Sequence, residues 1–133
     1  MNREPIDNLI IYLMAISNYA KDIHYNCFGA NFYGNHLFAD RIHDKMDDYI
    51  DQLKEICLLG HQLSPLHSSE YLKKAASIIP YGADFESMKE LLIKTLALIE
   101  QIKDVSKGDE NLAGAIAQDI QNNVGLINIM YGD

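Results

Sequence analysis

The sequence predicts an all-α protein: a four-helix bundle with a short extra helix in its longest connection. Three observations predict this fold class. Apolar residues recur at helical spacing through four long segments, and strand-like alternation is nearly absent. Glycine or proline stands at each expected interruption between these segments. The chain of 133 residues has the size of one domain, so we treat residues 1–133 as a single unit around one core.

The first two helices are expected to fill the N-terminal half of the chain. The first begins near Pro5, which suits a first helical turn, and its apolar stripe reaches Cys27. Residues 28–34 then turn the chain with two glycines. The second helix is expected to run to about Leu59, with Gly60 as its end signal. Its apolar positions are Phe38, Ile42, Met46, Tyr49, Ile50, Leu53, Ile56 and Cys57.

A long connection separates these helices from the last two. It covers residues 60–83, within which residues 68–77 are expected to form a short helix. The third helix opens at Asp84, a favourable N-cap, and its apolar stripe extends to Val105. Gly108 is expected to separate it from the last helix, whose stripe runs from Leu112 to Met130. Four long helices with one lengthy crossover match a ferritin-like bundle better than a bundle with short loops.

Composition excludes several classes of function. The formal net charge of −8, from 19 acidic residues against 11 Lys and Arg, disfavours binding to nucleic acid or an anionic membrane and favours cations. No stretch is apolar over the length of a membrane span, and no signal-peptide pattern occurs, so we expect a cytoplasmic protein. Cys27 and Cys57 are too few for a disulfide framework and are expected to be reduced packing residues. Hydrolase and nucleotide-binding motifs are missing.

The second helix carries a polar face opposite its apolar one. At about 100° per residue, the acidic residues fall on one side, and Arg41 and Lys45 lie at its margin or beyond. Such a stripe is most often a solvated surface. Like charges one turn apart repel, however, so this arrangement gains nothing unless a cation or a partner meets it. We call this set the acidic face; it comprises Asp40, Asp44, Asp47, Asp48, Asp51 and Glu55, with His36 at its N-terminal end.

Two pairs on this face are spaced four residues apart, His36 with Asp40 and Asp51 with Glu55. Asp40 and Asp51 are separated by about 16 Å along one helix, too far to share an ion. The four positions are nevertheless symmetric about the midpoint between residues 45 and 46. If a second copy of the helix packs antiparallel across a two-fold axis there, His36 meets the partner's Glu55 and Asp40 meets the partner's Asp51. Such sites would suit Fe(II), Mn(II) or Zn(II).

A family resemblance rests on these residues. The run His24-Tyr-Asn-Cys-Phe-Gly-Ala-Asn-Phe32 and the four positions above resemble the ferroxidase signature of the Dps proteins, or mini-ferritins. That signature has a His, a second His twelve residues later, Asp four later, Asp eleven later and Glu four later. The residues that meet these intervals are His24, His36, Asp40, Asp51 and Glu55. The likeness extends over the whole chain in helix order.

The resemblance implies a function. His24, His36 and Asp40 of one subunit would bind iron with the partner's Asp51 and the partner's Glu55, in a mono-iron or di-iron site where Zn or Mn can substitute. Family members form dodecamers from two-fold dimers, oxidise Fe(II) with hydrogen peroxide or dioxygen, and store ferric mineral, which protects against oxidative damage. We therefore expect an iron-storing ferroxidase, an oxidoreductase acting on Fe(II). The alternative is a Dps-like helical assembly with a passive zinc site or an empty one, and no ferroxidase activity.

The chain departs from the family pattern at several positions. Tyr25 stands where Trp is usual, and Ile56 follows Glu55 where Arg is common. No Lys-rich tail is present, so DNA binding is not expected. The acidic pore residues of the family have no clear counterparts beyond Asp109 and Glu110. Among the remaining histidines, His43 is expected to pack or to lie in an interface, and His61 and His67 are expected to face solvent.

Overall fold

The computed structural model describes residues 2–132, and within that range it contains helices and no strand. The elements are α1 (Glu4–Asn26), α2 (Phe32–Glu55), the π-helical turn η1 (Ile56–Gly60), α3 (Ser68–Ala76), α4 (Phe85–Glu100) and α5 (Lys107–Tyr131). The prediction of an all-α protein with four long helices and one short one is therefore confirmed.

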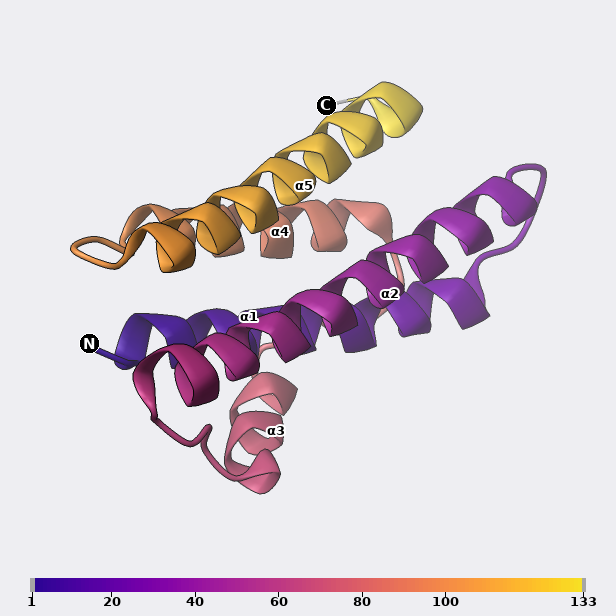
Figure 1. Ribbon diagram of the computed structural model, residues 1–133. Coiled ribbons are helices and arrows are strands. Elements are labelled where there is room, and N and C mark those ends of the chain that lie inside the picture. The colour runs from indigo at the N-terminus through magenta and orange to yellow at the C-terminus, as the bar shows by residue number, and fades with distance from the viewer. Residues whose placement is uncertain (1, 133) are drawn as a thin grey trace.

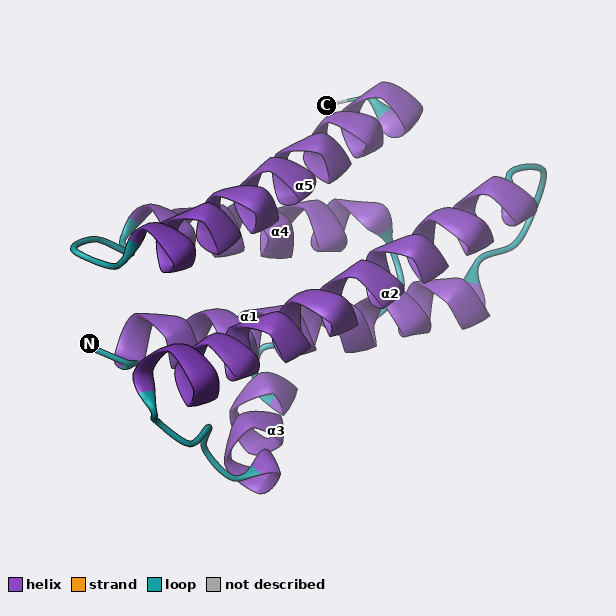
Figure 2. Ribbon diagram, in the orientation of Figure 1, coloured by secondary structure: helices purple, strands orange, loops and turns teal. Residues whose placement is uncertain are grey.

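The long helices lie in two antiparallel pairs, α1 with α2 and α4 with α5 (Figure 1). α1 also packs against α4 and α3, and α2 touches α5. Helices α1 and α5 run in one direction and α2 and α4 in the other, because the chain crosses the length of the molecule between α2 and α4 (Figure 1). The loops that join α1 to α2 and α4 to α5 lie at opposite ends of the molecule (Figure 2).

The core is centred on α1. This helix is covered by α2, α3 and α4, so its buried residues occupy most directions around its axis. Leu9, Ile10 and Leu13 are completely buried. The apolar positions predicted for the second helix face the core as expected, although Tyr49 on α2 and Ile56 at the start of η1 are only partly buried. None of the helices described here combines the length and the apolarity that crossing a bilayer demands.

The second helix ends near the predicted residue, but its last turn is not α-helical. α2 ends at Glu55, and Ile56–Gly60 continue directly from it as a π-helical turn. Leu63 N donates to the carbonyl oxygen of Cys57 at 2.9 Å, which bends the chain into the following loop. Cys57 is thereby 1% exposed, in the core, while Leu59 is 70% exposed. A wider turn of this kind leaves little trace in an apolar periodicity.

The boundary between the last two helices is also misplaced in the prediction. α4 ends at Glu100, short of Val105, and Asp104 has a φ of 57°, which an α-helix does not accommodate. Gly108 lies inside the first turn of α5 and does not precede it. The N-cap is Ser106, whose Oγ accepts a hydrogen bond from Asp109 N at 3.2 Å.

The N-cap predicted for the third helix is confirmed. Asp84 Oδ1 accepts a hydrogen bond from Ser87 N at 2.7 Å, at the start of α4. The phenol oxygen of Tyr19 accepts a hydrogen bond from Asp84 N at 3.0 Å. Tyr19 is completely buried, so it ties α1 to the start of α4 as a packing residue.

Candidate functional site

Two of the predicted ligands, His24 and His36, lie against each other where α1 ends and α2 begins. Their rings stack, with centroids 3.5 Å apart and an angle of 19° between the planes. Nδ1 of His24 donates to the carbonyl oxygen of His36 at 2.8 Å, and Nδ1 of His36 donates to the carbonyl oxygen of His24 at 2.7 Å. Because a carbonyl oxygen only accepts, both rings carry a proton on Nδ1. The Nε2 lone pair of each neutral ring therefore remains for another partner.

The loop between α1 and α2 makes this reciprocal pairing possible. Gly29 has a φ of 88°, a conformation that residues with a side chain rarely adopt. Its carbonyl oxygen accepts a hydrogen bond from Phe32 N at 3.1 Å, so the chain reverses within a few residues. The reversal places the last turn of α1 beside the second turn of α2. Phe32 stacks on His36 with centroids 5.0 Å apart, which adds an apolar wall to the histidine pair.

Asp40, the third predicted ligand, lies one turn beyond His36 on α2. Its Oδ1 is 2.8 Å from Nζ of Lys21 on α1. The hydrogen bond from Lys21 is the main cause that lowers the pKa of Asp40, and the positive charge of Lys21 acts in the same direction. The same pair raises the pKa of Lys21. Asp40 is thus held as a carboxylate near the histidine pair, with an ammonium on one of its oxygens.

Asp51 and Glu55 lie farther along α2 and are exposed. The structure therefore brings His24 and His36 together, places Asp40 near them and leaves the other two ligands apart. Within residues 2–132 of this one chain, no group of three or more His, Cys, Asp or Glu side chains is arranged to hold a metal ion. The separation follows from helical geometry, since residues eleven apart on a straight helix are about 16 Å apart.

The acidic face is open to solvent in the single chain. Apart from Asp40, which is half-buried, its carboxylates are exposed, as the sequence predicts. A row of like charges on one helix raises the local concentration of cations and is costly to cover with an uncharged surface. Any partner that meets this face must therefore bring or bind positive charge.

His43 packs between α1 and the acidic face. Its Nδ1 donates to the carbonyl oxygen of Ser17 at 3.0 Å, and its Nε2 is 3.2 Å from Oδ2 of Asp47. Ser17 Oγ donates to Oδ1 of Asp47 at 2.7 Å. In a catalytic triad the serine hydroxyl donates to the histidine and the carboxylate orients the opposite ring nitrogen. Here Ser17 Oγ lies 2.9 Å from Nδ1 of His43, but that nitrogen carries the proton donated to the Ser17 carbonyl oxygen and cannot accept one. The hydroxyl donates to the carboxylate, so this Ser-His-Asp group does not form a triad.

The structure corrects the expectation that His61 faces solvent. Its Nε2 is 2.7 Å from Oδ2 of Asp109, a side chain that is only 4% exposed. His61 therefore ties the end of η1 to the first turn of α5. Asp109 is occupied by this contact, which leaves it unsuited to line a pore. His67 is exposed, as expected, and its Nδ1 accepts a hydrogen bond from Ser69 N at 3.2 Å at the start of α3.

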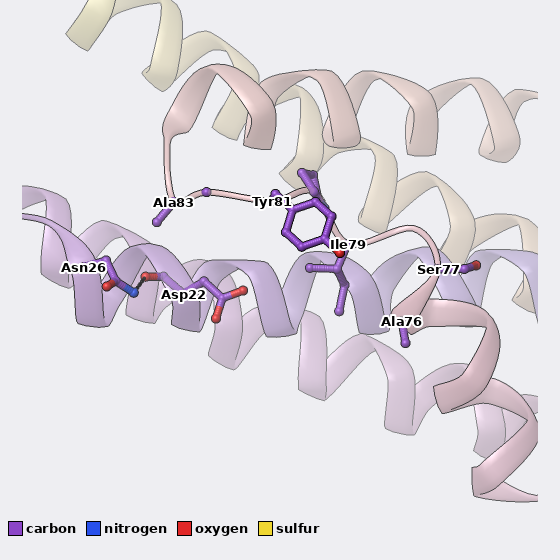
Figure 3. A pocket seen from close by; sticks show the side chains of 9 residues that line it. Asp22, Asn26, Ala76, Ser77, Ile79, Tyr81 and Ala83 are labelled. Atoms are coloured by element: carbon purple, nitrogen blue, oxygen red, sulfur yellow. Dashed lines mark hydrogen bonds between the residues drawn. The ribbon is translucent and has the colours of Figure 1, made fainter.

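An open groove of about 730 Å³ lies between the C-terminal half of α1 and the loop from α3 to α4 (Figure 3). Asp22 and Asn26 of α1 line one side, and Tyr81, which is fully exposed, lies on the other. Asn26 donates to the carbonyl oxygen of Asp22 at 2.6 Å, so its amide is already engaged. None of the five predicted ligands lines this groove.

Compared with protein-family models and with curated proteins, the chain matches none.

Proposed function

We propose that this protein is a Dps-like mini-ferritin that oxidises Fe(II) at sites shared by two subunits and stores the ferric product. The reciprocal pairing of His24 and His36 carries the proposal. Each ring donates a hydrogen bond from Nδ1 to the backbone carbonyl oxygen of the other histidine, which leaves its Nε2 free to bind a metal. Metal-binding histidines in proteins are almost always fixed by a hydrogen bond of this kind, which sets the tautomer and the ring orientation.

The proposed partner is a second copy of the chain. Phe32 and Tyr33, at one end of the acidic face, are 42% and 71% exposed, and Leu58 and Leu59, at the other end, are 48% and 70% exposed. In antiparallel pairing about the midpoint between residues 45 and 46, Tyr33 comes opposite the partner's Leu58 and Phe32 opposite the partner's Leu59. The pairing that joins the ligands thus also covers exposed apolar side chains, which commonly mark an interface.

In this dimer, the histidine pair and Asp40 of one subunit meet the partner's Asp51 and the partner's Glu55. Imidazole nitrogens and carboxylate oxygens suit Fe(II), and the anionic oxygens favour its oxidation by stabilising the higher charge. One hydrogen peroxide molecule accepts one electron from each of two Fe(II) ions, and protons are released as the ferric product hydrolyses. The exposed carboxylates concentrate Fe(II) near the site.

The arrangement of the helices supports the ferritin-like part of the proposal. Ferritin-like bundles contain one long crossover, and here the chain crosses the molecule between α2 and α4 (Figure 1). We extend the proposal to the assembly and the location that the resemblance implies, a cytoplasmic dodecamer of two-fold dimers. An assembly of the same kind with a passive zinc site is the competing function, because zinc accepts the same ligands.

The first test is oxidation of Fe(II) by hydrogen peroxide added without oxygen, followed by ferric absorbance. We expect oxidation by the wild-type protein and none above background in the double variant His36→Ala plus Asp51→Ala. The control is His67→Ala plus Glu100→Ala, which removes a histidine and an acid from other exposed positions. Unchanged oxidation in the first double variant contradicts the site. Zinc binding without any Fe(II) oxidation by the wild type favours the passive assembly.

A mixing experiment tests the sharing of the site between subunits. A dimer of His36→Ala subunits and a dimer of Asp51→Ala subunits each have two defective sites. A mixed dimer has one site with both defects and one intact site, because its ligands come from both chains. After unfolding and refolding the two variants together, we expect about one quarter of the wild-type oxidation rate, since half of the dimers are mixed. No recovery on mixing contradicts a site built from two chains.

A further inference from the structure

We propose that Lys21 is a built-in competitor for the metal at Asp40, so that a divalent cation binds only by displacing or repelling the lysine ammonium. The inference rests on the proposed function, because it assigns Asp40 to the metal site. It adds a residue that lowers the metal affinity of the site and that the ligand pattern does not contain.

The position of Lys21 is fixed by both helices that form the site. It lies three residues before His24 on α1, one turn away on the same side of the helix. Its Nζ is 2.8 Å from Oδ1 of Asp40 on α2 and 5.7 Å from the centroid of the Tyr25 ring. A carboxylate and an aromatic face both attract an ammonium group, so the lysine is directed toward the metal ligands.

The lysine ammonium and a metal ion compete electrostatically at Asp40: either one excludes the other, or each weakens the binding of the other. A carboxylate has two oxygens, but an ion on one of them lies only about 4–5 Å from an ammonium on the other, where the repulsion is strong. Displacing the ammonium from Asp40 costs the same free energy whichever cation replaces it. A divalent cation offsets more of this cost than Na⁺ or K⁺ does, because its attraction to the carboxylate is about twice as strong at the same distance.

The alternative role for Lys21 is purely structural: a salt bridge that holds α1 and α2 together, here called a pin. The buried core already joins these helices, through Leu13, Ile16, Ile42 and Met46 among others. A pin and a competitor also predict opposite effects: losing a pin weakens the metal site, whereas losing a competitor strengthens it. The sign of the change in metal affinity therefore separates the two roles.

The test is a calorimetric titration with Co²⁺ in the absence of peroxide. Co²⁺ serves as a divalent probe, so binding is measured separately from iron oxidation. Lys21→Gln keeps an N–H that can donate to Asp40 and removes the charge. Lys21→Arg keeps the charge and offers two parallel donors to the carboxylate, which makes it a stronger competitor. Lys94→Gln, at an exposed position on α4, is the control for net charge.

We expect the Kd for Co²⁺ to fall about three- to fivefold in Lys21→Gln, which is the upper part of the range that one exposed ion pair spans. We expect it to rise in Lys21→Arg and to stay within twofold in Lys94→Gln. Equal or weaker binding by Lys21→Gln overturns the inference. Absence of Co²⁺ binding in every variant overturns both the inference and the proposed function. The expected order of Kd values together with no Fe(II) oxidation leaves the role of Lys21 intact and refutes only the ferroxidase function.

Discussion

Leu59→Ser is expected to weaken the proposed dimer strongly. Leu59 lies at the C-terminal end of the acidic face, where it is 70% exposed in the single chain. In the antiparallel pairing its side chain contacts the other subunit near the partner's Phe32. The substitution removes an apolar side chain that the fold of one chain does not need, so the monomer should keep its stability.

The size of the effect follows from the exposed area. Burying a whole leucine side chain contributes about 1.5–3 kcal/mol, so covering the exposed part of Leu59 contributes about 1–2 kcal/mol. Two-fold symmetry places the residue in the interface twice, which gives about 2–4 kcal/mol per dimer. The dissociation constant of the dimer should therefore rise about 30- to 1000-fold.

Sedimentation equilibrium over a dilution series measures this constant, and circular dichroism checks that the variant is folded. Ile93→Ser is the matched control, because Ile93 is 47% exposed but lies on α4, away from the acidic face. A dissociation constant of Leu59→Ser within threefold of the wild-type value refutes the antiparallel arrangement. An equal loss in Ile93→Ser refutes its specificity.

The remaining predictions concern the tyrosines and the histidine pair. Burial, aided by the neighbouring carboxylates Asp7 and Asp119, raises the pKa of Tyr71 and of Tyr49 to about 12, whereas an unfolded tyrosine ionises near pH 10. The folded state thus holds these two phenol protons more tightly than the unfolded state does. The stability that the protonated phenols contribute is present below pH 10 and is lost as the pH rises through about 12. The urea midpoint of unfolding should therefore fall steeply across this window, and less steeply in Tyr71→Phe. At neutral pH Tyr71→Phe should also lower the free energy of unfolding by about 1–3 kcal/mol, because Asp7 loses a donor and Leu66 N an acceptor, and an unchanged urea midpoint would count against it. Nitrogen-15 NMR of the neutral rings of His24 and His36 should show the proton on Nδ1, and a proton on Nε2 in both would contradict the reciprocal pairing.

Features set by local chemistry were predictable from the sequence. Asp84 caps α4 because a carboxylate directly before an apolar helical run has free backbone N–H groups within reach. The two faces of α2 follow from the helical period alone. The ligand spacing along α2 was likewise readable, because regular helical geometry relates sequence distance to length.

Features set by contacts between distant segments were not predictable. His61 and Asp109 are 48 residues apart, and nothing near either one indicates the other. The Lys21–Asp40 pair depends on how the turn between α1 and α2 places the two helices. Asn123 is only 2% exposed, although the polarity of its side chain predicts an exposed position on α5. Its burial results from the packing of other helices around it and could not be predicted from the sequence pattern.

The reciprocal hydrogen bonds of His24 and His36 link the turn between α1 and α2 to the chemistry beside it. Each imidazole closes the hairpin by bonding to the main chain opposite, so a substitution of either histidine loosens the hairpin as well as removing a nitrogen donor. Inserting or deleting a residue between Cys27 and Asn31 would shift α1 relative to α2, so that the backbone carbonyl oxygens of His24 and His36 would no longer meet the opposite imidazole. Both rings would then lose their orientation. The length of that short loop is therefore as much a determinant of the site as the identity of the side chains it aligns.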